Sequence, residues 1–216
     1  MATKKDGGGL SRREQRRLHH QEISRAQLLD AAEEVFGRKG FHAATLKEVA
    51  ELAEFSVGSV YSFFESKDDL FRQIFLRRGE EFMARIREVL EPDGSPVEQL
   101  HRLVDFQIGW FRENPHFGRL FLRSASAAML TADALVDERV VANYDEVMRL
   151  QADLFARGQA SGELHPGDPE VLARLFSGLM AAYQALDPQV VSDAADAQER
   201  FPLAELHELV DRTFVR

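Results

Sequence analysis

The segment "SVGSVYSFF", residues 56–64, carries small and hydroxyl-bearing residues at spacings that could gather them on one surface. In a helix, Val60 and Phe64 stand one turn apart, so they would form its buried face. The residues left to face outward would be Val57, Gly58, Ser59, Tyr61 and Ser62. Hydroxyl groups suit phosphate oxygens, and a glycine lets a second backbone approach closely. The segment is therefore predicted to contact a nucleic acid.

Caps and apolar spacing indicate the helices that would position this segment. One face of a preceding helix would carry Leu28, Ala32, Val35 and Phe36, and Gly40 would end it. Thr45 and Glu48 have the spacing of a capping box before "LKEVAELA", and Ser56 would cap the next helix. Two short helices joined by a tight turn are the layout of a helix-turn-helix, whose second helix enters the major groove. Helical corners with this spacing also occur in proteins that do not bind DNA.

The ordered set of features from Leu28 to Leu70 resembles the TetR family of bacterial transcriptional regulators. It comprises an A…F…G first helix, a Thr-capped second helix, an S-x-G-x-x-Y-x-x-F third helix and a Ser-Lys pair that opens the fourth. The resemblance implies a homodimer that binds a palindromic operator, usually as a repressor. It also implies release of the operator by a small ligand held in the C-terminal domain.

The resemblance assigns DNA contacts to particular positions. Thr45, Tyr61 and Lys67 match phosphate contacts of the family, with Lys67 at the mouth of the fourth helix. The groove-facing start of the recognition helix matches Ser56, Val57, Gly58 and Ser59, with Ser62 on the same exposed side. The structural alternatives are a solvated lysine at Lys67 and a ring packed on the surface at Tyr61.

Three positions depart from the family pattern. Val57 stands where a polar side chain is frequent, so its expected readout is apolar contact with a thymine methyl group. Phe63 stands where His or Tyr often donates to a phosphate, and it cannot donate. Glu54 occupies the turn position usually held by glycine, where a positive φ would cost about 1 kcal/mol.

The N-terminus is a separate basic segment. Six Lys/Arg face two Asp/Glu within the first twenty residues, and three consecutive glycines predict a flexible arm over residues 1–21. The arginines expected to lie along the DNA backbone or in the minor groove are Arg12, Arg13, Arg16 and Arg17. An ordinary solvated tail is the alternative interpretation.

Charge and composition narrow the class of protein. The net charge of the 216 residues is −9, but residues 1–67 carry a net +1 and residues 68–216 a net −10. This division favours contact with a polyanion at one end only. The chain has no cysteine, which fits a cytoplasmic location, and no apolar run long enough to span a membrane. No secretory signal is expected, because the N-terminus lacks an apolar core.

The rest of the chain is also predicted to be helical, giving an all-α protein of about nine helices. We expect a helix-turn-helix domain over residues 22–66 and a ligand-binding and dimerisation domain over residues 67–216. The histidines show no metal-ligand spacing and no nucleophile motif is present, so no metal, cofactor or enzymatic activity is predicted. The alternative function is a helical small-molecule or lipid carrier that does not bind DNA.

Aromatic residues of the second domain could line a pocket for a small, largely apolar ligand. The candidate ligand-binding residues are Phe75, Phe82, His101, Phe106, Gln107, Trp110, Phe117, Phe121, Tyr144 and Met148. The alternative is a packed helical core. A ligand beside the long helix that starts near Ser66 would tilt it and move the recognition helices apart.

The last two helices are predicted to form a homodimer interface, because the first of them is apolar on more than one face. The candidate interface residues are Leu172, Leu175, Phe176, Leu179, Tyr183, Leu206 and Val210. A buried central helix within a monomer is the competing interpretation.

Overall fold

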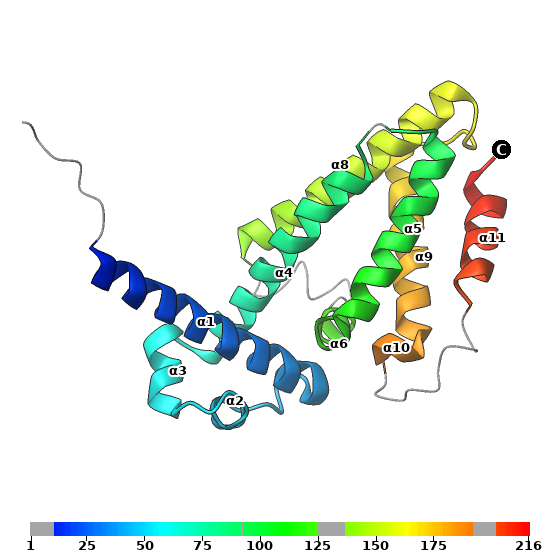
Figure 1. The fold of residues 1–216 in the computed structure, drawn as a ribbon. Helices are drawn as coiled ribbons and strands as arrows, with labels where there is room; N and C mark the ends of the chain where they lie inside the picture. Colours follow the sequence, from blue (N-terminus) through cyan, green and yellow to red (C-terminus); the bar gives the residue numbers. More distant parts are fainter. Residues whose placement is uncertain (1–10, 92, 125–136, 192–201) are drawn as a thin grey trace, which may run out of the picture.

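The computed structural model describes residues 11–91, 93–124, 137–191 and 202–216, and within them the secondary structure is helical apart from one isolated antiparallel bridge between Leu164 and Val215. Figure 1 shows the arrangement. The helices are α1 (Arg12–Lys39), α2 (Leu46–Leu52), α3 (Val57–Phe63), α4 (Lys67–Val89), α5 (Pro96–Glu113), α6 (Pro115–Ser124), α8 (Glu138–Ser161), α9 (Pro169–Leu186), α10 (Pro188–Val191) and α11 (Leu203–Phe214). The predicted all-α fold is confirmed.

The four-residue helix α10 follows α9 after a single residue. Asp187 begins it, because its carboxylate accepts the Gln189 N–H at 3.0 Å. Residues 125–136, between α6 and α8, lie outside the described ranges.

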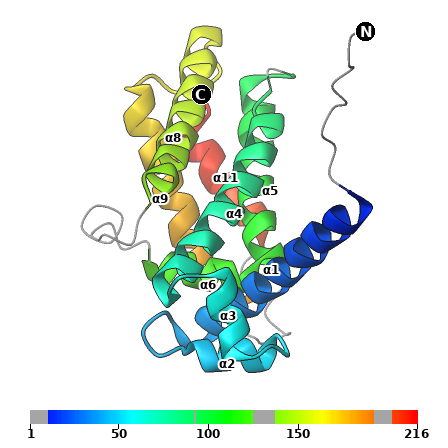
Figure 2. The ribbon, with the colours of Figure 1, turned by 90° about the vertical axis from the view of Figure 1, so that its left-hand side faces the viewer.

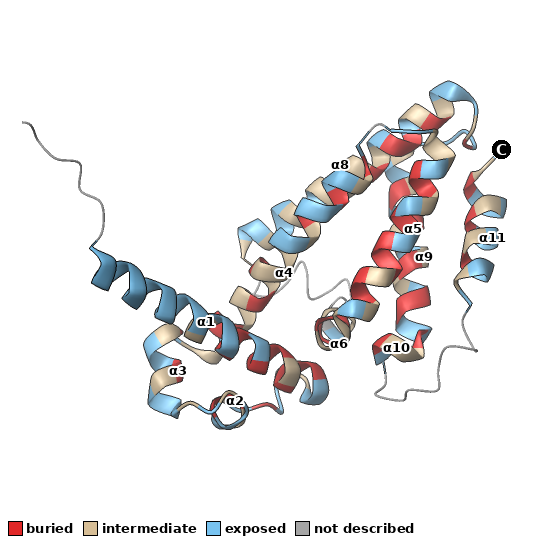
Figure 3. Cartoon of the chain, viewed as in Figure 1, coloured by how far each residue is buried: buried red, intermediate tan, exposed pale blue. Residues whose placement is uncertain are grey.

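Helix α1 begins earlier than predicted, so the flexible arm over residues 1–21 is wrong from Arg12 onward. Ser11 and Glu14 form a capping box, in which the Ser11 hydroxyl accepts the Glu14 N–H at 3.3 Å and the Glu14 carboxylate accepts the Ser11 N–H at 2.8 Å. The first turns of α1 are exposed (Figure 3), so the cap and the adjoining packed turns sustain them rather than burial. Residues 1–10 lie outside the described ranges.

Helices α1, α2 and α3 form a small three-helix unit around one core. Phe36, Val49 and Val60 are completely buried, and Phe64 closes the core where α3 ends. Figures 1 and 2 both show α2 and α3 together against α1. The predicted division of α3 into a buried face and an outward face therefore holds for Val60 and Phe64.

The remaining helices form a larger bundle in which α8 packs against α4, α5 and α9. The small unit joins this bundle through α4 and α6, both of which contact α1. At Gly37 of α1 an added Cβ would lie only 2.5 Å from the His116 carbonyl oxygen of α6. Arg123 of α6 also donates to the Gly37 carbonyl at 3.1 Å, so the end of α1 sits directly on α6.

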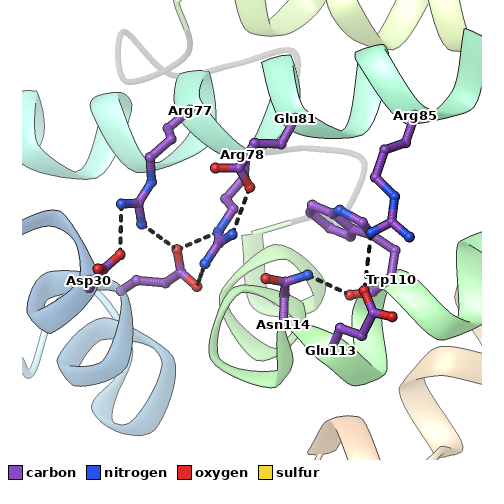
Figure 4. Close-up of polar contacts among 9 residues, drawn as sticks. Asp30, Arg77, Arg78, Glu81, Arg85, Trp110, Glu113 and Asn114 are labelled. Atoms are coloured by element: carbon purple, nitrogen blue, oxygen red, sulfur yellow. Dashed lines mark hydrogen bonds and ion pairs between the residues drawn. The ribbon is translucent and has the colours of Figure 1, made fainter. Parts of the chain in front are cut away.

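A buried carboxylate ties α1 to α4 (Figure 4). Glu33 is 5% exposed and accepts two hydrogen bonds from Arg78, at 2.8 and 2.9 Å, and a third from Arg77 at 3.1 Å. Arg77 also reaches Asp30, and Arg78 reaches Glu81, each at 2.7 Å. Burial opposes the charge on Arg78, but hydrogen bonds and attraction from Glu33, then Glu81, raise the pKa of Arg78 above its ordinary value.

The C-terminal helix α11 contacts α5 through two reciprocal His–Asp pairs. His101 of α5 lies 2.6 Å from Asp211 of α11, and His207 of α11 lies 2.7 Å from Asp105 of α5. The two imidazole rings meet edge to face with centroids 5.0 Å apart. The end of the chain is held as well, because the His165 N–H donates to the Phe214 carbonyl at 2.8 Å.

Replacing Glu33 by Gln should lower the free energy of unfolding by about 2–4 kcal/mol, because two arginines would lose a buried charge partner. Urea denaturation of the purified protein measures this change. Glu34→Gln is the matched control, since Glu34 pairs with the more exposed Arg38 and its loss should cost less than about 1 kcal/mol. Equal costs for the two variants would contradict the assigned role of Glu33.

Candidate nucleic-acid interface

The two short helices are set by side-chain caps at their N-termini. The Thr45 hydroxyl accepts the Glu48 N–H at 3.3 Å, and the Glu48 carboxylate accepts the Thr45 N–H at 2.9 Å, which confirms the predicted capping box. The Ser56 hydroxyl accepts the Ser59 N–H at 3.0 Å and so starts α3. Thr45 and Ser56 therefore both lie at helix ends, where unpaired N–H groups and the helix dipole favour an anion.

The acidic side chain beside Thr45, Glu48, has its negative charge balanced by a basic neighbour. Lys39 of α1 pairs with Glu48, and this contact, followed by the hydrogen bonds from Thr45, lowers the pKa of Glu48 to about 2. Glu48 therefore stays ionised and capped over the ordinary pH range, with its charge balanced by a neighbouring ammonium. The surface at the start of α2 carries no uncompensated negative charge from this residue.

The outward face of α3 exposes the side chains that the sequence placed there. The Tyr61 side chain is 57% exposed, and Val57, Gly58 and Ser62 are also exposed, while Ser59 is half-buried. Some of these hydroxyl groups form hydrogen bonds within the helix itself. The Ser56 and Ser59 hydroxyl oxygens lie 2.8 Å apart, and the Ser62 hydroxyl donates to the Ser59 carbonyl at 2.6 Å. The hydroxyl of Ser62 is thus left as an acceptor.

Two positions that depart from the family pattern, Val57 and Phe63, lie on α3 and have different surroundings. Val57 lies exposed on the first turn, where its methyl groups are available for apolar contact. Phe63 is half-buried and packs against the hydrophobic core. Phe63 therefore contributes to the stability of the unit, in place of the phosphate donor that stands there in the family pattern.

The turn between α2 and α3 has a positive φ at Glu54, the position where the family usually has glycine. Glu54 has a φ of 59° and is the only non-glycine residue with positive φ in the described ranges. Its neighbour Phe55 donates its N–H to the Ala50 carbonyl at 2.8 Å, which closes the turn after α2. A side chain with a Cβ is disfavoured in this left-handed conformation.

The basic residues of the N-terminal segment lie on the first turns of α1. Arg12, Arg13, Arg16 and Arg17 are all exposed. In Figures 1 and 2 this end of α1 projects beyond α3 and away from the rest of the small unit. The arginines are therefore carried by a helix, which corrects the expectation of a flexible arm, and they remain accessible to a partner.

Most of the candidate ligand residues come together in one chain of aromatic contacts. Phe75 meets Phe117 at 5.3 Å between ring centroids, Phe117 meets Trp110 at 5.4 Å, and Trp110 meets Phe82 at 5.1 Å. Phe82 in turn meets Phe106 at 5.0 Å, and Phe121 lies 6.0 Å from Phe117. Figure 4 shows Trp110 beside α4, where Arg85 also reaches Glu113 at 3.1 Å.

The polar candidates are dispersed. His101 is engaged with Asp211 and His207 at the α5–α11 contact, and its predicted role in ligand binding stays a prediction. Tyr144 is exposed on α8, and Gln107 is buried within α5. Met148 lies half-buried beside Ser177 of α9, whose hydroxyl is 3.8 Å from the sulfur.

Sequence reasoning missed a buried polar residue at the same contact between α8 and α9. Gln151 is 0% exposed, and its side-chain oxygen accepts from Ser177 at 2.8 Å. Its amide nitrogen has no hydrogen-bond partner among the described residues. A glutamine in an apolar helical stretch gives no local signal, because only tertiary packing decides whether it is buried. An unpaired buried amide is costly and could serve a bound molecule.

Helices α9 and α11 expose apolar side chains on one face. Leu175 and Leu186 are 59% and 61% exposed, and Val171 and Leu209 are also exposed. A groove of about 350 Å³ runs between the two helices. Its lining residues are Leu179, Ala182, Tyr183, Leu186, Pro202, Glu205, Leu206 and Leu209.

Four of the predicted interface residues are largely buried within the protomer, and two of them, Tyr183 and Leu206, also line the groove between α9 and α11. Phe176 and Val210 are fully buried, and Leu206 and Tyr183 are nearly so. The Phe176 ring packs against Phe155 at 6.2 Å and Phe214 at 5.9 Å between centroids. Helix α9 thus has an inner face that is buried in the protomer and an outer face around Leu175 that is exposed.

Two further features concern other classes of site. In the described ranges no group of three or more His, Asp or Glu side chains could hold a metal ion. None of the described helices is both long enough and apolar enough to cross a membrane.

Comparisons with known proteins identify both parts of the chain. The family model described as bacterial regulatory proteins, tetR family, matches residues 28–74, and the tetracyclin repressor-like C-terminal domain matches residues 93–184. The HTH-type transcriptional regulator YhgD of Bacillus subtilis (strain 168) is 28% identical over 168 residues, which cover 74% of this chain and 84% of that protein.

Solved structures share the fold over most of the chain. A bacterial regulatory protein in the tetR family from Rhodococcus RHA1 has a TM-score of 0.70 at 24% identity, covering 88% of this chain and 95% of that one. The transcriptional regulator FadR from Bacillus subtilis, in complex with stearoyl-CoA, has a TM-score of 0.66 at 17% identity, covering 86% and 94%. At these identities the likeness concerns the fold.

Replacing Glu54 by Gly should raise the free energy of unfolding by about 0.5–1 kcal/mol, because glycine adopts a positive φ without a steric penalty. Thermal or urea unfolding checks this gain. Glu54→Ala is the control, since it removes the charge but keeps the Cβ and should give no such gain. A larger gain for alanine than for glycine would show that charge rather than backbone strain limits stability here.

Proposed function

Because the chain belongs to the TetR family of bacterial regulatory proteins, we propose that it is a homodimeric repressor that leaves a palindromic operator when a largely apolar small molecule binds. The observation that carries the proposal is the outward face of α3, with Val57, Gly58 and Tyr61 exposed at the end of a capped helix-turn-helix. This helix would enter the major groove, while the start of α2 would meet the phosphate backbone.

The proposed contacts divide by chemistry. Val57 would read a thymine methyl group, while Thr45, Tyr61 and Lys67 would contact phosphates. The arginines on the first turns of α1 would add contacts to the backbone or the minor groove. Such contacts compensate for the acidic body of the protein, because they concentrate positive charge at the end that meets DNA.

Lys67→Ala should weaken binding to all DNA sequences by a similar factor and lower the slope of log affinity against log salt by about one. The measurement is fluorescence anisotropy at several salt concentrations, with an operator obtained by binding-site selection on the wild-type protein. Arg149→Ala is the control, because it removes one positive charge from exposed α8 and should leave the slope unchanged. Weak binding without sequence preference in the wild type would favour a carrier that does not act on DNA.

A second copy of the chain is the proposed partner of the exposed α9–α11 face. Leu175, Leu186 and Leu209 leave a broad apolar surface open to water, which is costly for a monomer. The groove between the two helices would receive side chains of the other protomer. A two-fold axis at this face would place two copies of α3 at a fixed spacing, as successive major grooves about 34–36 Å apart require.

Leu175→Glu should shift the protein from dimer to monomer, because two charges would be buried near the two-fold axis. Sedimentation at micromolar concentration distinguishes a 24.5 kDa monomer from a dimer of twice that mass. Val141→Glu is the matched control, since it likewise replaces an exposed aliphatic side chain by an acid, but on α8. A dimer that survives Leu175→Glu and dissociates with Val141→Glu would move the interface to α8.

The ligand is proposed to bind beside the ring cluster of α4, α5 and α6. FadR binds stearoyl-CoA, which supports an apolar ligand for a chain of this fold. Phe82 and Trp110 supply apolar surface. Gln151 lies on α8, which packs against α4, and its buried amide N–H group would donate a hydrogen bond to a polar atom of the ligand. A ligand that displaced Phe82 would move α4, and Arg77 and Arg78 on the same helix would carry the movement to Glu33 of α1.

A further inference from the structure

The ammonium group of Lys67 is held in place before any DNA arrives. Lys67 is the first residue of α4, and its Nζ lies 4.5 Å from the centroid of the Phe41 ring. The same Nζ donates to the His42 carbonyl oxygen at 3.4 Å. Both contacts come from the loop between α1 and α2, so the lysine bridges from the start of α4 to the segment that leads into Thr45.

The Phe41 ring is itself fixed by its neighbours. It packs edge to face on Phe71 at 4.8 Å and on Phe36 at 5.9 Å between centroids. Phe36 is fully buried, and Phe71 packs against the core, so they anchor the half-buried Phe41 from beneath. The ring therefore presents a face of defined orientation to the ammonium above it.

Such a support suits a phosphate contact. An ammonium has three N–H donors, and the His42 carbonyl takes one of them, while attraction to the ring face needs no acceptor atom. A lysine side chain loses much rotational freedom when it is fixed in one position. Holding Lys67 in the free protein reduces the part of that loss that falls on DNA binding.

We propose that Phe41 is a positioning residue for DNA binding, whose ring holds the Lys67 ammonium toward a backbone phosphate next to the start of α2. The inference rests on the proposed function, because it explains how Lys67, one of the proposed phosphate contacts, is held in place. The competing account is that Phe41 only fills the core edge and that Lys67 is an ordinary solvated lysine.

The contact can be tested without DNA. In NMR spectra of the free protein, the Lys67 side-chain CH₂ protons nearest the ammonium should be shifted upfield by the ring of Phe41. The shift should vanish in Phe41→Leu and persist in Phe41→Tyr, which keeps the ring face. Proton shifts at ordinary solvated-lysine positions in the wild-type protein would overturn the proposal.

The consequence for binding is tested by a double-mutant cycle on the selected operator. Phe41→Leu should weaken DNA binding about two- to fivefold when Lys67 is present, and by much less in the Lys67→Ala background. Phe41→Tyr should bind like the wild type. The control is Phe55→Leu, another half-buried ring of the same unit, whose effect should be the same with and without Lys67.

The outcomes separate this proposal from the function on which it rests. If the wild-type protein selects no operator, the proposed function fails, while the NMR measurement still decides whether Phe41 holds Lys67. If the wild type binds its operator and the effects of Phe41→Leu and Lys67→Ala simply add, the function stands and the positioning role is overturned. Should Phe41→Leu unfold, the Phe41→Tyr and Lys67→Arg variants retain a test, because both should preserve the upfield shift.

Discussion

The buried carboxylate of Glu33 is the interaction on which the relation between the two parts of the protein depends. It accepts hydrogen bonds from Arg77 and Arg78 of α4, so the helix-turn-helix unit cannot rotate on the bundle without breaking a buried ionic contact. Such a contact has a small number of discrete arrangements rather than a continuous range. The close approach of α1 to α6 at Gly37 restricts the same movement from a second side. A ligand that altered the position of α4 would therefore move the helix-turn-helix unit as one rigid body.

The aromatic residues add a second connection between the same parts. Phe41 and Phe71 lie at the edge of the helix-turn-helix unit, and Phe71 continues through Phe75 and Phe117 to Trp110 in the bundle. Rings packed at 4.8–5.4 Å between centroids transmit displacement, because close-packed interiors have little free volume. The support under Lys67 is thus one end of a contact path that reaches the surface proposed for the ligand.

Features set by neighbouring residues were predictable from the sequence, whereas features set by distant residues were not. The caps at Thr45 and Ser56 follow from local patterns, and the structure has both. The positive φ at Glu54 was suggested only by the family resemblance, which places glycine at that turn position. The capping box at Ser11 and Glu14 has an equally local pattern, but the glycine-rich start of the chain concealed it. The partners of Glu33 lie far away in sequence, and nothing near Glu33 indicates them. Apolar periodicity located α9 but could not tell which of its faces the protomer itself would bury, so Phe176 and Leu175 were assigned together.

The two His–Asp pairs between α5 and α11 favour one register of the final helix. Each helix carries one histidine and one aspartate a single turn apart, His101 with Asp105 and His207 with Asp211, and the order places unlike groups opposite each other. A slip of α11 by one turn would bring either the two histidines or the two aspartates face to face, leaving the other groups without these partners. Leu206, Val210 and Phe214 are buried in the bundle, and the bond from the His165 N–H to the Phe214 carbonyl oxygen holds α11 in the same position as the polar pairs do. The position of α11 along α5 in turn sets where Leu209 lies beside α9. It thereby sets the shape of the groove that a second protomer would have to match.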